Sequence, residues 1–172
     1  MRNRYFIYIS FIITTLVFAS CRGDEVIILS ESEGIEGAKD VNANPYGFYL
    51  LNEGNMGSNK ASLDFMDFST GVYSHNIYAE KNPNVVKELG DVGNDAQIYD
   101  NKLWMVINAS HKVEVVEAKT AKRIGSIDVP NCRYIVFKDG FAYVSSYVTT
   151  IIGDIDAQEG AVFKIDTNTL EI

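Results

Sequence analysis

The sequence predicts an all-β fold, built as a partial β-propeller, from two observations. From Asn44 onward, apolar and polar residues alternate and turn residues recur every eight to twelve positions, which is typical of short antiparallel strands. A strand–turn–strand pattern then repeats, because residues 98–110 align without gaps with residues 136–148. The strand that follows each returning strand ends near a threonine, and the threonines at 70, 120 and 169 lie 50 and 49 residues apart. A repeat of this length made only of short strands indicates four-stranded propeller blades.

About two and a half to three antiparallel blades are expected within residues 44–172. Blade one, near residues 48–78, is expected to begin at its second strand, with strands at Phe48–Asn52, Leu63–Phe68 and Val72–Tyr78. Blade two, near residues 96–129, is expected to have all four strands of a blade, at Ala96–Tyr99, Leu103–Asn108, Val113–Glu117 and Arg123–Val129. Blade three, near residues 133–172, is expected to have strands at Arg133–Phe137, Phe141–Tyr147 and Ala161–Asp166.

Three blades are too few to close a ring, since natural propellers typically have at least about four blades. The strand that would complete blade one is expected to come from the far end of a longer chain, and open sheet edges are an aggregation hazard. We therefore expect a truncated, N-terminal part of a longer protein. Assembly of several copies into one ring is the alternative.

Residues 1–20 are predicted to be a lipoprotein signal peptide. Arg2 and Arg4 precede the uncharged run Tyr5–Phe18, and small residues follow it, which is the pattern of a secretory signal. A plain transmembrane anchor is the alternative, but a run of 14 residues is shorter than the roughly 20 needed to cross the bilayer. Phe18-Ala19-Ser20-Cys21 resembles the bacterial lipobox, which implies that Cys21 carries a lipid.

Residues 21–43 are predicted to be an acidic, flexible tether between the lipid and the folded part. Glu31, Glu33 and Asp40 lie among serines and glycines, a composition typical of a solvated linker. Acidic residues directly after the lipidated cysteine resemble the surface-export signal of Bacteroidota lipoproteins. This implies an outer-membrane protein that faces the cell exterior, with a periplasmic orientation as the alternative.

The charge of the chain argues against nucleic acid as a partner. The net charge is −8, and loss of the signal with its two arginines makes it −10. A protein that binds nucleic acid needs a cationic face. A protein that binds anionic lipid headgroups needs one as well, so the membrane contact is expected through the acyl chains alone. Cys132 is the only other cysteine; we expect a small buried residue rather than a nucleophile, and no internal disulfide.

The residues that carry chemistry in enzymes are scarce. His75 and His111 are the only histidines, and neither has a neighbour at metal-ligand spacing. Nucleophile-elbow and phosphate-binding glycine motifs are missing as well. We therefore predict that the chain is not an enzyme and that it holds no metal and no cofactor.

Polar residues at equivalent strand ends are expected to lie on one face of the propeller and to form one binding patch for a small ligand or a protein partner. The candidates are Asn52, Glu53, Asn55, Asn108, Ser110, His111, Arg133 and Tyr147. The alternative is that they satisfy backbone groups of their own turns. Arg133 aligns with Asp95, and this pair either lines the central channel or bridges adjacent blades.

Three stretches resemble the YncE-like (YVTN-type) propeller lipoproteins of Bacteroidota. They are Asn52–Asn55 with Ser62, Leu89–Asp95, and Val106–Ser110 with Arg133. Some of those relatives capture cobalamin and pass it to an outer-membrane transporter. The resemblance thus implies a non-enzymatic surface protein, with a corrinoid as one ligand and a transporter as one partner. The alternatives are a fragment of a propeller lyase or glycan hydrolase with its active site in further blades, and a non-functional remnant.

Overall fold

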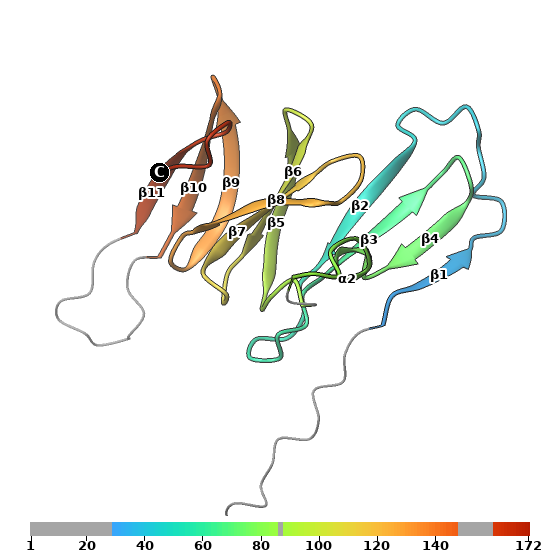
Figure 1. Ribbon diagram of the computed structural model, residues 1–172, viewed down its shortest axis with the longest axis horizontal. Helices are drawn as coiled ribbons and strands as arrows, with labels where there is room; N and C mark the ends of the chain where they lie inside the picture. The colour runs from blue at the N-terminus through green and yellow to red at the C-terminus, as the bar shows by residue number, and fades with distance from the viewer. Residues whose placement is uncertain (1–28, 86–87, 148–159) are drawn as a thin grey trace, which may run out of the picture.

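The computed structural model describes residues 29–85, 88–147 and 160–172 and shows an all-β, partial propeller of three antiparallel sheets (Figure 1). The first sheet has the order β1-β4-β3-β2, from Glu31–Gly34, Val72–His75, Ser62–Asp67 and Gly47–Asn52. The second has the order β5-β6-β7-β8, from Gly93–Tyr99, Lys102–Ile107, Lys112–Glu117 and Arg123–Asp128. The third has the order β11-β10-β9, from Ala161–Asp166, Phe141–Ser146 and Cys132–Lys138. A short helix, α2 at Ile77–Lys81, joins the first sheet to the second.

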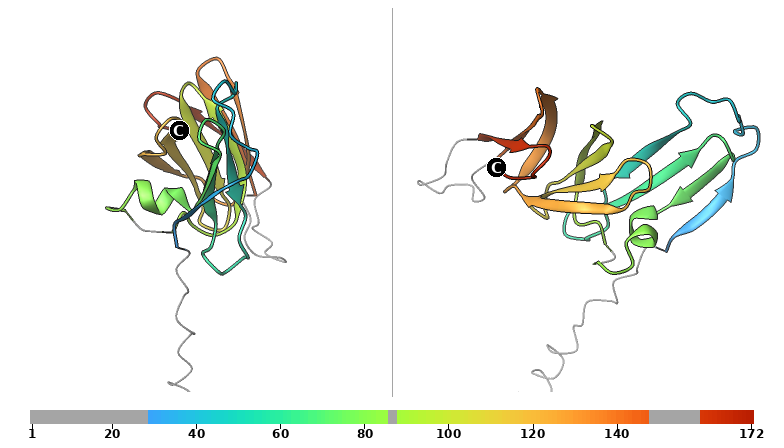
Figure 2. Two further views of the ribbon diagram at one scale, coloured as in Figure 1. Left: turned by 90° about the vertical axis from the view of Figure 1, so that its right-hand side faces the viewer. Right: turned by 45° about the horizontal axis from the view of Figure 1, so that its top comes forward.

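The three sheets are successive blades, which we call blades one, two and three. Strand β2 contacts β5, and both β5 and β6 contact β9, so the first strands of blades two and three pack against the blade before. Figure 2 shows the twisted sheets standing face to face in a row. The described residues contain no helix long and apolar enough to span a bilayer.

Strand β6 lies at the centre of the core because both of its faces are covered. Leu103, Met105 and Ile107 join the apolar cluster against blade one. Trp104 and Val106 join a separate cluster against blade three. Since side chains alternate along a strand, a continuous apolar run is what a strand buried on two sides requires.

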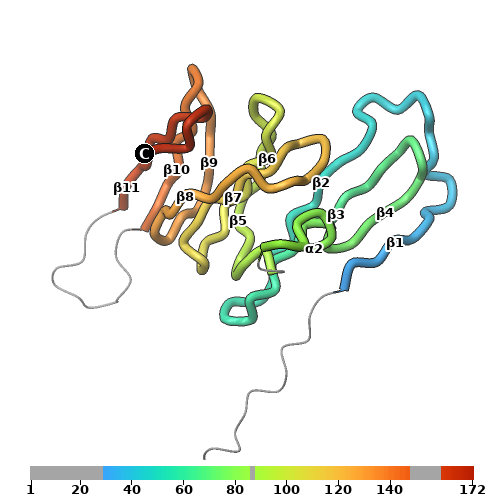
Figure 3. Tube along the Cα trace, viewed as in Figure 1, coloured from blue at the N-terminus to red at the C-terminus, as the bar shows by residue number. Residues whose placement is uncertain are grey.

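Strand β1 forms the outer edge of blade one. Glu31–Gly34 pairs antiparallel with β4, from Glu31 opposite His75 to Gly34 opposite Val72, and Figure 3 shows this segment running along the edge of the sheet. One prediction is therefore wrong, because the flexible tether does not extend over residues 31–34. The turn after β3 has the same hydrogen bond as the turns after β7 and β11, from Gly71, Ala121 and Leu170 N–H to the carbonyls of Asp67, Glu117 and Asp166. Strand β2 is therefore the second strand of blade one, as predicted, and β1 lies outside the fourth strand, β4.

The sequence of β1 lacks the alternating apolar pattern of a strand, because all four of its residues are exposed. Its side-chain contacts are polar: Ser32 Oγ lies 2.9 Å from Ser74 Oγ, and Glu33 Oε1 lies 3.3 Å from His75 Nε2. A charged, exposed strand is a common form of sheet edge. Cys21 and the signal peptide lie outside the described residues.

Candidate functional site

The predicted patch lies on the face where the β2–β3 and β6–β7 loops meet the segments that enter β5 and β9. The Asp91 carboxylate accepts hydrogen bonds from the N–H groups of Gly57 at 2.6 Å and Asn59 at 3.3 Å. The Asp91 N–H donates to Ser110 Oγ at 2.8 Å. Hydrogen bonds thus join the loop of blade one to that of blade two through Asp91, which lies in the Leu89–Asp95 stretch but is not among the eight predicted patch residues.

Three of the predicted patch residues use their side chains inside the protein. Asn52 Nδ2 donates to Asp64 Oδ2 at 2.8 Å, and Asn108 Nδ2 donates to the Cys132 carbonyl at 2.8 Å. Ser110 accepts from Asp91, as described above. These contacts are structural, but they reach beyond the residues' own turns, to β3, to the start of β9 and to the segment that enters β5.

Two further candidates, Glu53 and Asn55, are exposed, and their backbone carbonyls hold the loop. The Glu53 carbonyl accepts from Gly93 N–H at 2.9 Å, and the Asn55 carbonyl accepts from Ser58 N–H at 2.9 Å. Their side chains lie on the surface.

His111, Arg133 and Tyr147 gather at the start of blade three. The Asn131 N–H donates to His111 Nδ1 at 3.0 Å, and the Tyr147 N–H donates to the Asn131 carbonyl at 3.2 Å. The Arg133 guanidinium lies 5.4 Å from the centre of the Tyr147 ring, within cation–π range. Asp95 bridges blades, because its Oδ2 accepts from Ile135 N–H at 2.9 Å.

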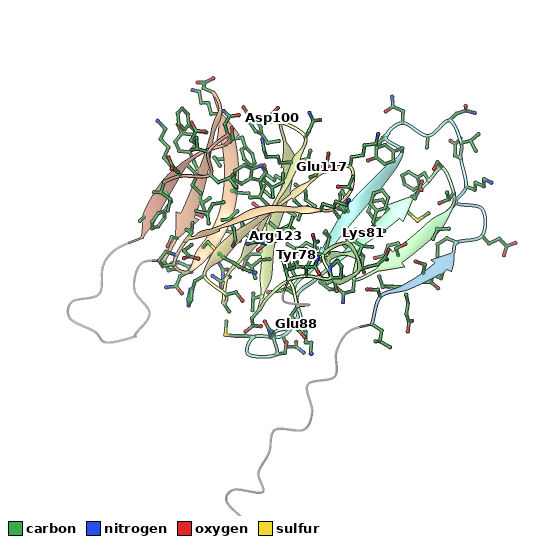
Figure 4. All side chains as sticks on the ribbon, in the orientation of Figure 1. Tyr78, Lys81, Glu88, Asp100, Glu117 and Arg123 are labelled. Carbon is green, nitrogen blue, oxygen red and sulfur yellow. The ribbon has the colours of Figure 1, made fainter. Side chains whose placement is uncertain are left out.

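A cavity of about 520 Å³ lies between blades one and two at the opposite ends of the strands. We call it the aromatic pocket. In Figure 4 its rim residue Glu117 lies near Asp100, well away from Glu88 on the face of the predicted patch. None of the eight predicted patch residues lines it. Its wall consists of Pro45, Tyr46, Gly47, Phe48, Tyr49, Phe65, Ile98, Asn101, Glu117, Ala118 and Lys119.

Three tilted rings form the apolar side of the aromatic pocket. The Phe65 ring lies 4.8 Å from Tyr49 at 42° and 6.1 Å from Tyr46 at 59°, centroid to centroid. Gly47 makes room for it, since a Cβ there would stand 2.7 Å from Phe65 Cζ and 2.2 Å from the Met66 carbonyl oxygen. Tyr46 is 52% exposed, so part of its ring is open to a ligand.

The polar side of the pocket comes from the end of β7. Tyr49 Oη donates to the Ala118 carbonyl at 2.8 Å and so ties the two blades together across the pocket. Burial, with the charges of Tyr46 and Glu117, raises the pKa of Tyr49 to about 12. The phenol therefore stays neutral and keeps its hydrogen bond at physiological pH. Asn101, Glu117 and Lys119 complete the rim.

The family model for the "Domain of unknown function (DUF5074)" matches residues 46–172. The chain belongs to the DUF5074 family. A search of curated proteins finds no match to it. The matched region of this DUF5074 chain begins at Tyr46, in the wall of the aromatic pocket, and contains every strand of the three sheets except β1.

The other reactive groups of the DUF5074 chain occupy structural positions. Cys132 is fully buried, as predicted, and burial raises the pKa of its thiol to about 11. His75 lies between two carboxylates, with Nδ1 3.4 Å from Asp64 and Nε2 3.3 Å from Glu33. In the described part of the chain, no group of three His, Cys, Asp or Glu side chains is placed to hold a metal.

Proposed function

We propose that this DUF5074 chain is a non-enzymatic binding protein that holds a flat, mainly apolar small molecule in the aromatic pocket. The observation that carries the proposal is the set of tilted rings, Tyr46, Tyr49 and Phe65, around a cavity of about 520 Å³. Pockets for small molecules typically measure about 300–1,000 Å³ and combine an apolar wall with a few polar groups. Aromatic rings contribute stacking energy beyond the area they bury.

The polar groups of the pocket suit recognition better than catalysis. Glu117 Oε2 already accepts from Thr120 Oγ1 at 2.5 Å, and Tyr49 Oη is held by the Ala118 carbonyl. The lining contains no histidine, serine or cysteine that could act as a nucleophile or base. It does contain Asn101, whose amide can orient a polar substituent of the ligand.

The wider setting we propose is that of a YncE-like surface lipoprotein. The lipid on Cys21 would anchor the chain in the outer membrane, and the ligand would pass to an outer-membrane transporter. This part rests on the sequence resemblance. A corrinoid is the ligand that the resemblance implies, and it is one of the probes in the experiment below.

Tyr46→Ala is expected to weaken the binding of a flat ligand about tenfold, since one aromatic contact is worth about 0.5–1.5 kcal/mol beyond its buried area. Riboflavin and cyanocobalamin serve as probes, with binding followed by riboflavin fluorescence and by calorimetry. Tyr134→Ala is the matched control, because Tyr134 on β9 is a similarly exposed tyrosine, at 58% against 52%, outside the pocket.

Equal affinity of the Tyr46→Ala and Tyr134→Ala variants would contradict the pocket as the binding site. Saturable binding of cyanocobalamin that is lost in Tyr46→Ala supports a corrinoid. Binding of riboflavin but not of cyanocobalamin would exclude a corrinoid as the ligand and would still support the aromatic pocket as the binding site.

Cys21→Ala is expected to abolish both acyl labelling and membrane association, because Cys21 is the proposed lipid attachment site. The measurement is metabolic labelling with an alkyne fatty acid, followed by membrane fractionation. Degradation of the wild-type protein by protease added to intact cells separates a surface orientation from a periplasmic one. Continued labelling of the alanine variant would show that the anchor has been assigned wrongly.

A further inference from the structure

A second cavity, of about 400 Å³, adjoins the aromatic pocket and has a different character. Tyr49, Phe65 and Lys119 line both cavities, so the two share a wall between blades one and two. The remaining lining is largely hydrophilic. It consists of Ser32, Ser74, Ile77, Glu80, Lys81, Thr120 and Ala121. We call this cavity the polar annex.

The polar annex is locally cationic, although the protein as a whole carries a net charge of −8. Lys119 and Lys81 both line it. A further cavity of about 300 Å³ continues from Lys81 to Lys122 and Arg123. Figure 4 shows Lys81 on α2 and Arg123 at the start of β8, in the region where blade one meets blade two.

The acidic residues near these cations do not neutralise all of them. Glu80 pairs with Lys81 at 2.6 Å, and the buried Glu114 pairs with Arg123 at 2.5 Å. The Glu117 carboxylate accepts from Thr120. Lys119 and Lys122 make no ion pair with any residue in the part of the chain that the structure describes.

Hydroxyl groups complete the lining. Ser32 Oγ and Ser74 Oγ lie 2.9 Å apart, one from β1 and one from β4, and Thr120 comes from the turn after β7. Hydroxyls and an ammonium are the groups that hold the oxygens of a carboxylate or phosphate. The lone carboxylate of the annex is already paired with Lys81.

We infer that the ligand of the aromatic pocket carries an anionic group, a carboxylate or a phosphate ester, and that the polar annex binds this group through Lys119. The inference rests on the proposed function, because the annex adjoins the pocket that holds the flat part of the ligand. The ligand class is thus a flat, apolar ring system with an acidic side chain.

The test uses two probes with the same ring system, riboflavin and riboflavin 5′-phosphate, which differ by one phosphate ester. The phosphate ester is expected to bind about tenfold more tightly at low salt, since charge-assisted hydrogen bonds are about twice as strong as neutral ones. The preference is expected to fall as salt rises. In Lys119→Glu, the ratio of the two affinities is expected to fall to about one or below.

Lys138→Glu is the matched control, because it makes the same charge change at an exposed lysine on β9 of blade three. It is expected to keep the wild-type ratio. Equal binding of the two probes to the wild type, with Tyr46→Ala still weakening both, overturns the inference and leaves the proposed function standing. A failure of Tyr46→Ala to weaken either probe overturns the proposed function, and the inference with it.

Discussion

Replacing Glu114 with alanine is expected to lower the free energy of unfolding by about 3 kcal/mol, because its buried carboxylate loses three hydrogen bonds, from the buried Tyr78 and the partly exposed Arg123 and Lys112. The Glu114 side chain is only 1% exposed. Its Oε1 accepts from Arg123 Nε at 2.5 Å and from Tyr78 Oη at 3.1 Å. Its Oε2 accepts from Lys112 Nζ at 3.1 Å. A loss of this size is a large share of the roughly 5–15 kcal/mol that stabilises a typical domain.

The effect extends beyond blade two because Tyr78 belongs to α2. Figure 4 places Tyr78 and Arg123 together between the two blades, and Tyr78 is itself buried. Burial, and then the charge of Glu114, raises the pKa of Tyr78 above its usual range. The stability that comes from the neutral phenol is therefore present below about pH 10 and is lost as the pH rises above that value.

The measurement is urea unfolding followed by the fluorescence of Trp104, the only tryptophan. Trp104 is fully buried between blades two and three. Tyr78→Phe is the matched control that removes one hydrogen bond and no charge, and we expect it to lower the unfolding free energy by about 1 kcal/mol. If Glu114→Ala unfolds at the same urea concentration as the wild type, the Glu114 cluster does not stabilise the junction of the blades.

The strands of the core were predictable because their apolar pattern follows from their burial. The continuous run Leu103–Ile107 in β6 is apolar since one set of its side chains packs on blade one and the other on blade three. Turn residues such as Asp100 and Asn101 mark the hairpin that precedes it, and both adopt positive φ, at 49° and 58°. The alternation of apolar residues and the turn residues predict the same strand ends there. The predicted boundaries in blade two therefore fall within one or two residues of the observed strands. The exception is β5, which begins three residues before its predicted start, at Gly93.

Strand β1 was not predictable in the same way, because backbone pairing rather than burial holds it. Its residues Glu31–Gly34 are exposed and have the composition of a linker. These residues form a strand only because their backbone pairs with the edge of β4, and the composition of the segment does not indicate this pairing. Composition alone therefore assigns these residues to the tether.

The aromatic pocket was overlooked because its rings look like core residues in the sequence. Tyr49 and Phe65 lie on strands at positions where the alternating pattern predicts burial. The signal that could have identified the site is Gly47, which begins the apolar strand β2 where the Phe65 ring approaches the backbone. The predicted patch shows the reverse error, because polar side chains such as Asn52 and Asn108 look like binding residues in the sequence but form hydrogen bonds inside the protein.

Asp64→Ala is the second large effect, with an expected loss of about 2–3 kcal/mol in the free energy of unfolding. Asp64 is buried on β3, and three donors converge on its carboxylate. Oδ2 accepts from Asn52 Nδ2 at 2.8 Å and from Tyr73 Oη at 2.9 Å. Oδ1 accepts from the Asn76 N–H at 2.8 Å. Hydrogen bonds to a charged group are worth more than neutral ones, about 1.5–3 kcal/mol each.

The titration of Tyr73 reports on the same carboxylate. Burial, followed by the hydrogen bond and the charge of Asp64, raises the pKa of Tyr73 to about 12. Because the folded pKa lies above the unfolded value of about 10, this contribution to stability is complete below pH 10 and is lost as the pH rises toward 12. In Asp64→Ala, the pKa of Tyr73 is expected to fall back toward 10, measured as phenolate absorbance during an alkaline titration.

Asp67→Ala is the matched control, since Asp67 lies on the same strand and bonds only within its own turn, to Ser69 N–H at 2.8 Å and Ser69 Oγ at 2.6 Å. It is expected to lower the unfolding free energy by about 1 kcal/mol or less and to leave the Tyr73 titration unchanged. Equal losses in the two variants would mean that the Asp64 carboxylate is no more important than an ordinary turn residue. An unshifted Tyr73 in Asp64→Ala would show that burial alone sets its pKa, and that the charge of Asp64 does not reach it.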